Sequence, residues 1–335
     1  MRYALRFWAE NITPLQIAER ALPLLAEYGA GVAVSVYRES LTDENARALL
    51  EVKDAGVGLS VWPLLSREEG YFPNEKNAAP YAALVEEVLD WALDSGVVPD
   101  AVAVDLELPY GQMMAMLEGG TAGRSRAALR MLRENRDARR FRDSWEGMSK
   151  LNSLIHSRGV RTVAAILPWV ALELEGGHVL VQDLMETPVA GIDWDVLSPM
   201  WYVSMFTGMT GGLISERDAN WLLYEAGLSL RCRYGPRAGV SLGLTGTGVL
   251  GDEPVFSSPE GLMVGVEASL AAGIRDISIY NLEGILTSED PRSWMDALAG
   301  ARPRVPERSR KVSGALAFGR VVYPPLAALV ERVWN

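Results

Sequence analysis

The sequence predicts an α/β protein built as a single (β/α)8 barrel, the TIM-barrel fold. Eight short apolar segments alternate with helical segments along the chain, which is the order of elements in that fold. The length of 335 residues is long for one ordinary domain but normal for a barrel with insertions. A doubly wound open sheet would carry a glycine-rich turn after its first strand, and residues 9–13 read Ala-Glu-Asn-Ile-Thr instead.

The predicted elements follow one another in a regular order from the N-terminus. Strands are expected at residues 2–8, 31–37, 57–64, 101–108, 161–168, 196–204, 239–244 and 276–282. Helical patterns occupy residues 14–28, 43–55, 77–95, part of 112–158, 215–231, 259–272 and 291–299. Residues 171–194, between the fifth and sixth strands, show no convincing helix, and Gly176-Gly177 indicates a turn.

Two segments depart from a minimal barrel, which we expect to span residues 1–301. Residues 110–149 form a helical insertion after strand four, with an arginine-dense run at 124–142. The acids interleaved with these arginines favour a solvated helix face with i,i+4 pairs, and an anion-binding or subunit-contact patch is the alternative. Residues 302–335 form a C-terminal tail, in which an extended linker precedes a short amphipathic helix at 324–334.

Composition limits the class of protein and its partners. Apolar residues make up 49% of the chain and charged residues 22%, as in a globular protein with a well-filled core. The net charge of −11 argues against nucleic acid or an anionic membrane as a partner. The sequence shows no apolar run of membrane-spanning length and no signal peptide, so we expect a cytoplasmic protein, or a secreted one where a signal was trimmed. The tail could contact a second subunit, so a homo-oligomer is compatible with the sequence.

The most informative feature is a pair of carboxylates at the end of strand four. Side chains alternate along a strand, so Asp105 and Glu107 point to the same side, which they share with Ala101 and Ala103. Two like charges this close resist joint ionisation, so one pKa should rise. A protonated acid beside an ionised helper is the arrangement used in glycoside hydrolysis. Two solvated acids at a strand end are the alternative, which the expected burial of the strand disfavours.

Other strand ends carry aromatic and polar residues. In a barrel of this kind the chemistry lies at the carboxyl ends of the strands. Strand one ends at Trp8 and Glu10 with Arg6 on the same face, and an inward Arg6 needs an acidic partner such as Asp105 or Glu283. Flat aromatic rings pack against the C–H faces of sugars, although single aromatic residues also fill cores. The predicted substrate-binding residues are Arg6, Trp8, Trp62, Met200, Tyr280, Asn281 and Glu283.

Several other chemistries lack the residues they need. His156 and His178 are the only histidines and neither falls at a strand end, so we expect no metal site and no Ser-His-Asp arrangement. We likewise expect no cofactor. The single Cys232 lies in a helical stretch and cannot form an internal disulfide. A glycine-rich stretch at 243–248 follows strand seven, where barrels bind phosphate, but it lacks the lysine of a P-loop.

In strands four to eight the chain resembles glycoside hydrolase family 18, the chitinase-like barrels. The strand-four pattern of that family is Asp-Gly-x-Asp-x-Asp-x-Glu, in which Asp100, Asp105 and Glu107 here occupy the first, third and last acidic positions. Ala101 replaces the glycine and Ala103 replaces the middle aspartate. The resemblance covers roughly half of the chain, and no motif is intact.

The later strands extend this resemblance. The strand-six pattern Met-x-Tyr-Asp is matched by Met200 and Tyr202, with Val203 in the place of the aspartate. The strand-eight pattern Trp-Ser-Leu-Asp/Glu is matched at residues 280–283, where Tyr280 replaces the tryptophan. The family's extra α+β insertion between strands seven and eight has no counterpart in residues 245–258, which are too few. The resemblance therefore implies a shallower and more open cleft.

The resemblance also implies roles for individual residues. Glu107 would be the general acid, and Asp105 would orient a substrate 2-acetamido group whose carbonyl oxygen attacks the anomeric carbon. Tyr202 would hydrogen-bond that carbonyl, and Tyr280 would form the floor of the sugar subsite. This substrate-assisted route is an exception to the two-carboxylate scheme. The predicted catalytic residues are therefore Glu107, Asp105 and Tyr202, and the predicted partner is a carbohydrate.

Three alternatives remain open at the level of the sequence. A two-carboxylate glycosidase could use Glu283 as nucleophile or base, because strand seven offers no acid. A non-catalytic carbohydrate-binding barrel would use the same acids only to hydrogen-bond hydroxyl groups. An enzyme acting on a phosphorylated metabolite would use the glycine-rich stretch after strand seven.

Overall fold

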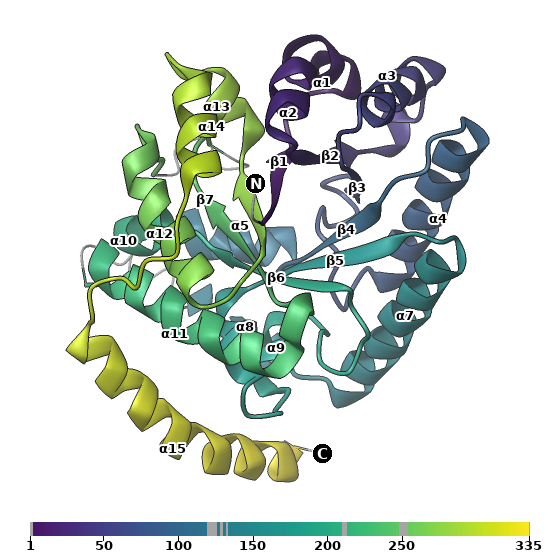
Figure 1. Ribbon diagram of the computed structural model, residues 1–335. Helices are drawn as coiled ribbons and strands as arrows, with labels where there is room; N and C mark the ends of the chain where they lie inside the picture. Colours follow the sequence, from purple (N-terminus) through teal and green to yellow (C-terminus); the bar gives the residue numbers. More distant parts are fainter. Residues whose placement is uncertain are drawn as a thin grey trace.

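The computed structural model is a closed barrel of eight parallel strands that pair in sequence order, with β8 returning to β1. Helices surround this barrel on its outside (Figure 1). The structure describes residues 3–118, 126–127, 130–131, 133–209, 213–247 and 254–334. The predicted (β/α)8 fold is confirmed, and each predicted strand overlaps an observed one.

All eight strands are short and buried. Their bounds are β1 (Ala4–Ala9), β2 (Gly31–Val36), β3 (Leu59–Pro63), β4 (Ala101–Leu106), β5 (Arg161–Ile166), β6 (Val196–Trp201), β7 (Gly239–Gly243) and β8 (Asp276–Tyr280). The helices before β5 are α1 (Pro14–Arg20), α2 (Leu22–Tyr28), α3 (Asp43–Asp54), α4 (Ala78–Asp94), α5 (Tyr110–Glu118) and α7 (Ala138–Ser157). The later helices are α8 (Pro168–Glu173), α9 (Leu180–Met185), α10 (Val203–Met209), α11 (Glu216–Tyr234), α12 (Pro259–Ala271), α13 (Leu282–Leu286), α14 (Pro291–Gly300) and α15 (Arg310–Trp334).

Strand alternation divides the core into two layers. Apolar residues such as Val32, Val102 and Ile277 point outward and pack against the helices. Trp8, Ala103 and Met200 point inward and form a second cluster inside the barrel. The register sets Trp8 opposite Tyr280 across the seam between β1 and β8. Every strand is covered on both faces, which is the burial expected of a parallel sheet.

The segment between β5 and β6 differs from the prediction. Two helices of six residues each, α8 and α9, occupy the stretch where no helix was expected. Both are too short to show a clear 3.6-residue pattern. The predicted turn at Gly176-Gly177 is confirmed, and it lies between them with Gly177 at a φ of 74°.

The excursion after β4 is shorter than predicted. The continuous helix α7 begins at Ala138, where the side chain of Asp137 accepts hydrogen bonds from the amides of Arg139 and Arg140. It packs against α4 and β5 as a helix of the barrel. The insertion therefore ends at Asp137, whereas the prediction extended it to residue 149. Its residues 119–125, with part of the arginine-dense run, lie outside the described residues.

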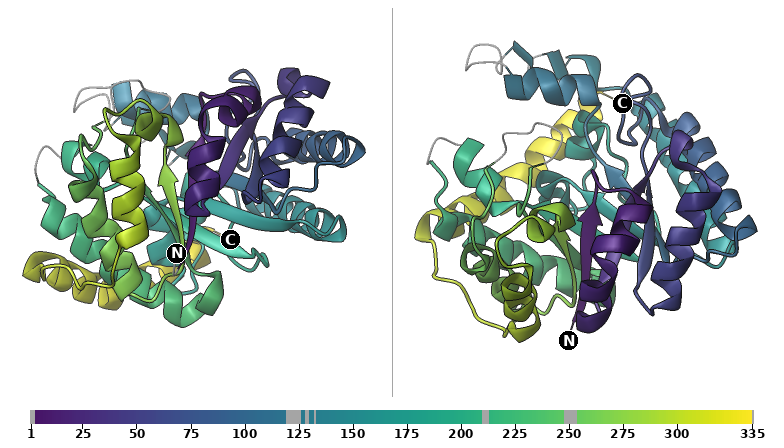
Figure 2. Two further views of the ribbon diagram at one scale, coloured as in Figure 1. Left: turned by 45° about the horizontal axis from the view of Figure 1, so that its top comes forward. Right: turned by 90° about the horizontal axis from the view of Figure 1, so that it is seen from above.

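The C-terminal tail also differs from the prediction. Residues 302–309 are extended as expected, but the helix that follows, α15, begins at Arg310 and not at residue 324. It crosses the outside of α11 and α9 (Figures 1 and 2). Its stretch Arg310–Val330 is long and apolar enough to cross a membrane by length and composition, and almost none of it is buried. The sequence-based statement that no apolar run reaches this length is therefore corrected.

Candidate active site

The two acids of β4 lie at the carboxyl end of the barrel, as predicted. Asp105 points into the barrel interior and is only 5% exposed. Its Oδ1 atom has no hydrogen-bond partner among the described residues. Glu107 follows the end of β4 and is half-buried. Burial raises the pKa of Asp105 well above its usual range, and the charges of Glu107 and Glu10 add to the effect.

Glu107 has the environment of an acid that keeps its proton near neutral pH. Burial and, as the second cause, the negative charge of Glu10 together raise the pKa of Glu107 to about 8. A carboxyl group with such a pKa is protonated at neutral pH and can donate a proton to a leaving group. The sequence predicted a raised pKa for one acid of the pair. In the structure the pKa of both Asp105 and Glu107 is raised.

A third carboxylate, Glu10, completes the acidic group. It directly follows β1 and is 5% exposed. The Tyr71 hydroxyl donates a hydrogen bond to its Oε1 at 2.7 Å, and the Tyr280 hydroxyl donates one to its Oε2. The Tyr37 hydroxyl lies 3.0 Å from that of Tyr71 and extends the chain. Ser35 Oγ donates to the Glu10 carbonyl at 2.7 Å, which fixes the backbone that carries the carboxylate.

Sequence reasoning did not select Glu10, Tyr37 or Tyr71 as site residues. Alternation from Trp8 already placed Glu10 on the inward face, so this signal was available. Tyr37 comes directly after β2, and Tyr71 lies in the connection between β3 and α4. A position in a connection gives no periodic pattern, so only the folded structure brings Tyr71 to Glu10.

Aromatic rings line the same end of the barrel. The rings of Tyr202 and Tyr280 lie 5.7 Å apart, and those of Trp8 and Trp62 lie 4.8 Å apart at an angle of 71°. Trp8 Nε1 donates to Ser241 Oγ at 3.1 Å, whereas Trp62 Nε1 is buried without a partner among the described residues. These rings and the acids offer both flat apolar surface and proton donors and acceptors, which is the combination a sugar requires.

The tyrosine hydroxyls near the acids stay protonated. Burial raises the pKa of Tyr202 well above its usual range, and the charges of Asp105, Glu107 and Glu10 add to this. Burial and Glu10 raise the pKa of Tyr280 in the same way. Both hydroxyls therefore remain hydrogen-bond donors throughout the neutral range.

The strand β7 approaches these tyrosines through a glycine. A Cβ atom added to Gly243 would lie 2.5 Å from the carbonyl oxygen of Tyr280 and 3.4 Å from the ring of Tyr202. Any side chain at this position would push the two strands apart. Gly243 therefore allows the Tyr202 and Tyr280 rings to meet.

The structure brings together most of the predicted site residues but not Arg6. Asp105, Glu107, Trp8, Trp62, Met200, Tyr202 and Tyr280 all lie inside the barrel or at its carboxyl end. Arg6 pairs with Asp276 at 3.2 Å and also donates to Ser278 Oγ at 3.1 Å. Its partner is therefore neither of the two acids proposed from the sequence. Asp276 begins β8, so Arg6 is held at the opposite end of the barrel from Glu107.

The side chains of Asn281 and Glu283 form hydrogen bonds with the protein's own backbone. The Asn281 side chain caps α13 by accepting from the amide of Gly284 at 3.0 Å, and its Nδ2 donates to the Thr247 carbonyl at 3.1 Å. Glu283 Oε1 accepts from the amide of Asn11 at 2.5 Å. Glu283 lines a surface pocket of about 860 Å³ beside α1 and α14. Burial raises its pKa, and the hydrogen bond from Asn11 opposes that shift.

The glycine-rich stretch after β7 lies only partly within the described residues. Thr245 Oγ1 donates to the Asn281 carbonyl at 2.6 Å and accepts from the Asn281 amide at 3.0 Å. It therefore joins the ends of β7 and β8. Gly248 lies outside the described residues, so the alternative that places a phosphate at this stretch is not tested.

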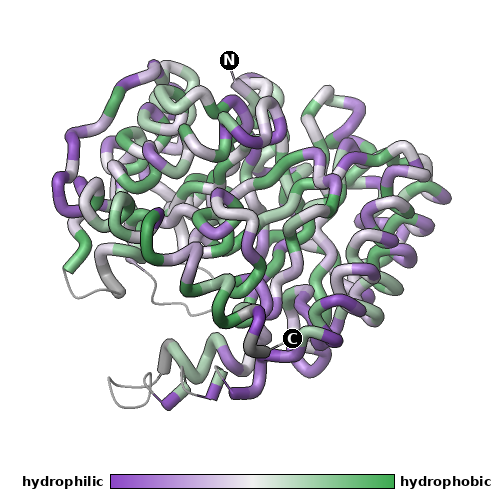
Figure 3. Tube along the Cα trace, turned by 90° about the horizontal axis from the view of Figure 1, so that it is seen from below, coloured by the Kyte–Doolittle hydropathy of each residue, from purple (hydrophilic) through white to green (hydrophobic). Residues whose placement is uncertain are grey.

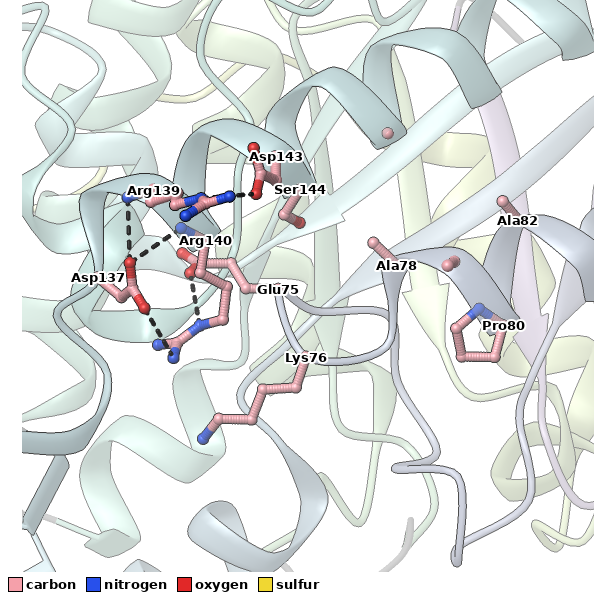
Figure 4. Close-up of a pocket in the computed structure, with 12 residues that line it drawn as sticks. Glu75, Lys76, Ala78, Pro80, Ala82, Asp137, Arg139, Arg140, Asp143 and Ser144 are labelled. Carbon is pink, nitrogen blue, oxygen red and sulfur yellow. Dashed lines mark hydrogen bonds and ion pairs between the residues drawn. The ribbon is translucent and has the colours of Figure 1, made fainter.

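Arginines near the insertion form a separate ionic cluster outside the barrel (Figure 4). Arg140 pairs with Glu75 at 3.3 Å and with Glu186 at 3.0 Å, and Lys76 also reaches Glu186 at 3.0 Å. Both glutamate side chains are fully buried. In contrast, Arg139 is 91% exposed and meets Asp143 at 3.9 Å, as an i,i+4 pair of a solvated face. The predicted solvated face is thus present, and Arg140 is the exception within it.

No cluster of three or more His, Cys, Asp or Glu side chains within the described part of the chain is arranged to hold a metal ion. The two histidines are engaged elsewhere. His156 Nε2 lies 2.8 Å from Asp195, and the His178 ring packs edge-on against Tyr323.

Comparison with known proteins supports the fold. No family model and no curated protein sequence matches this chain. Among solved structures, the PgaB (BpsB) glycoside hydrolase domain from Bordetella bronchiseptica superposes with a TM-score of 0.54 at 11% identity, over 89% of this chain and 99% of that one. An L-ribulose 3-epimerase matches with a TM-score of 0.47 at 14% identity, over 99% of this chain and 98% of that one. At 11% identity the likeness to the glycoside hydrolase domain shows a shared barrel fold alone, and family 18 membership in particular is not shown.

Proposed function

We propose that the protein is a glycoside hydrolase that cleaves a glycosidic bond in an oligo- or polysaccharide. The observation that carries this proposal is the half-buried Glu107, with a pKa raised to about 8, beside the buried Asp105 in an aromatic barrel mouth. General acid catalysis needs a group that is protonated at the working pH and yet able to release its proton. Glu107 meets both conditions.

In the proposed mechanism Glu107 protonates the leaving glycosidic oxygen. The carbonyl oxygen of a substrate 2-acetamido group attacks the anomeric carbon, so the glycosidic bond breaks as an oxazolinium ring forms. Asp105, which has to be ionised at this stage despite its raised pKa, accepts a hydrogen bond from the acetamido nitrogen and stabilises the positive charge, and the Tyr202 hydroxyl donates to the acetamido oxygen. Water then opens the ring while Glu107, now ionised, takes up the proton of that water, and the acid is restored.

The grouping of the three carboxylates favours the protonated form of Glu107. Ala103 stands where the family 18 pattern has an aspartate, so Asp105 lacks that neighbour. Glu10 supplies a negative charge instead, from the end of β1, which is not adjacent to β4 in the barrel, and this charge raises the pKa of both Asp105 and Glu107. We therefore assign Glu10 the role of a positioning residue that keeps the acid protonated.

A second candidate function is a two-carboxylate glycosidase with Glu10 in place of Glu283. Two tyrosine hydroxyls hold the Glu10 carboxylate inside the barrel, and its charge acts on Glu107. Glu283 instead faces the pocket outside the barrel. In this variant Glu10 acts as nucleophile or base, and Glu107 is still the acid.

Activity measurements on the purified protein test the proposal. Chromogenic glycosides and oligosaccharides are compared with and without a 2-acetamido group, for the native protein and for Glu107→Gln. We expect turnover of at least one glycoside and a loss of 100- to 10,000-fold in Glu107→Gln, with a smaller loss for substrates that have good leaving groups. The matched control is Glu44→Gln on the exposed face of α3, which should keep full activity.

The two mechanisms differ in the intermediate. A thiazoline mimic of the oxazolinium ring should inhibit tightly if the substrate supplies the nucleophile. A 2-fluoro sugar that leaves a covalent ester on Glu10 would replace this mechanism by the two-carboxylate one. Full activity in Glu107→Gln would remove Glu107 from both.

A further inference from the structure

The last helix, α15, is fastened to the barrel along one side only. Val312 and Ala327 are buried on that side. Ser313 Oγ accepts from Trp221 Nε1 at 2.9 Å, Arg320 pairs with Glu175 at 3.2 Å, and the Tyr323 hydroxyl donates to Glu173. These contacts hold the helix against α11 and the α8–α9 segment.

The opposite side of α15, here called the outer face, is apolar and exposed. Five of the twelve large hydrophobic side chains that are exposed in the described part of the chain lie on this one helix, which is an uneven distribution. They are Phe318 (69% exposed), Val321 (73%), Val322 (39%), Leu326 (52%) and Leu329 (59%). Figure 3 views this side of the molecule, where the chain leading to the C-terminus is largely green. Scattered apolar residues are normal on a surface, but a contiguous patch marks an interaction site.

Exposed arginines precede this apolar patch along the chain, in the linker before α15 and at the first residue of α15. Arg302, Arg304, Arg308 and Arg310 are exposed, and none of them forms an ion pair with another described residue. The one acid in this stretch, Glu307, is already paired with Arg217 at 2.8 Å. Arg332 is exposed near the other end of α15. The apolar stripe of the outer face is therefore preceded in the chain by four exposed arginines and followed by Arg332.

We propose that the outer face of α15 docks on the surface of an anionic lipid bilayer. Its apolar side chains would enter the boundary between headgroups and acyl chains while the helix lies in the plane of the surface. The free arginines would contact the anionic headgroups. This proposal replaces the expectation that the net charge of −11 argues against an anionic membrane, because charges farther from the surface than the Debye length of about 8 Å are screened.

The charges decide between a bilayer and a second copy of the chain. Two copies packed along the outer face bring arginine against arginine in a parallel arrangement. In an antiparallel arrangement the arginines around Arg308 meet Arg332 of the other copy. An anionic surface complements both ends at once. A helix that spans the bilayer would have to give up the Arg320–Glu175 pair and the Tyr323–Glu173 hydrogen bond, which lying on the surface preserves.

Co-sedimentation of the full chain with vesicles tests this docking. We expect binding to vesicles of mixed phosphatidylcholine and phosphatidylglycerol, and much weaker binding to phosphatidylcholine alone. The variant R304Q/R308Q/R310Q should lower the partition coefficient on the order of 100-fold, since each arginine contributes roughly fivefold. The variant F318S/V321S/L329S should also lower it by at least about tenfold, because it removes the inserted area.

Matched variants elsewhere on the surface serve as controls. R126Q/R130Q/R139Q removes the same charge, and V98S/L228S/V264S removes exposed apolar side chains from other places, so both should bind like the native protein. Circular dichroism verifies that each variant is folded. Equal binding to neutral and anionic vesicles would overturn the proposal, as would resistance to extraction by alkaline carbonate, which indicates a spanning helix. A lipid-free dimer that F318S/V321S/L329S dissociates would assign the outer face to a second copy instead.

Discussion

The hydroxyl of Tyr280 donates a hydrogen bond to the carboxylate of Glu10, and this contact joins the end of the last strand to the end of the first. The two residues lie 270 positions apart in the sequence. Their hydrogen bond runs across the seam at which Trp8 pairs with Tyr280 and the barrel closes. The pairing of β8 with β1 therefore both closes the barrel and brings the Tyr280 hydroxyl to Glu10.

Removing the hydroxyl should destabilise the protein. Tyr280→Phe removes a hydroxyl donor from the buried Glu10 carboxylate, at a cost of roughly 2 kcal/mol in the free energy of unfolding. Tyr81→Phe is the matched control, because the Tyr81 hydroxyl is buried and has no partner among the described residues. Its removal should be neutral or slightly stabilising. Urea unfolding of both variants measures the difference, and equal effects would contradict this reading.

The pKa of Glu107 gives the activity a definite pH dependence. A general acid works only while protonated, so kcat/KM should fall as the pH rises through about 8. Stability should change over the same range. Between the ordinary carboxyl pKa near 4.5 and about 8, the folded protein keeps a proton on Glu107 that the unfolded chain releases, so its contribution to stability declines as the pH rises. Glu107→Gln should flatten this decline in unfolding experiments across that window.

Glu10 should set the pH at which the activity falls. Its negative charge raises the pKa of Glu107, so Glu10→Gln should move the alkaline limb of the pH profile to lower pH. Glu283→Gln is the matched control, because Glu283 is not among the groups that shift Glu107. If the alkaline limb of the pH profile moves equally in both variants, or in neither, Glu10 does not control the pKa of Glu107.

Arg6 should matter for stability and not for substrate affinity. Arg6→Met leaves Asp276 without its partner at the amino end of the barrel, where both side chains are largely buried. We expect a loss of roughly 2 kcal/mol in the free energy of unfolding, the value of a hydrogen bond between charged groups. KM for any glycoside substrate should stay unchanged. An increase in KM without a loss of stability would instead indicate that Arg6 binds the substrate.

The ionic cluster beside the insertion offers a comparison between neighbouring arginines. Arg140→Gln removes the cation that pairs with the buried Glu75 and one of the two cations that pair with the buried Glu186, and should cost roughly 3 kcal/mol. Arg139→Gln changes an exposed residue of the same helix and should cost less than about 0.5 kcal/mol. Thermal or urea unfolding of the pair is sufficient. Equal losses would mean that the cluster adds no stability beyond that of a surface pair.

The fold and half of the site could be predicted because they follow local patterns. Alternation along β4 predicted that Asp105 and Glu107 share a face, and the eight apolar segments predicted the barrel. The partner of Arg6 could not be predicted, because it depends on which residue the register places near β1 at closure. Tyr71 reaches Glu10 from a connecting segment, and α8 and α9 are too short for a periodic signal.

The seam between β1 and β8 also sets when the protein becomes competent during synthesis. The ribosome releases Glu10, Asp105 and Glu107 long before it releases Tyr280. Until β8 takes its place beside β1, the barrel is open and Glu10 lacks the hydroxyl donor that Tyr280 supplies. A nascent or truncated chain without β8 therefore lacks the closed barrel that buries Glu107 and raises its pKa, and we expect it to be inactive.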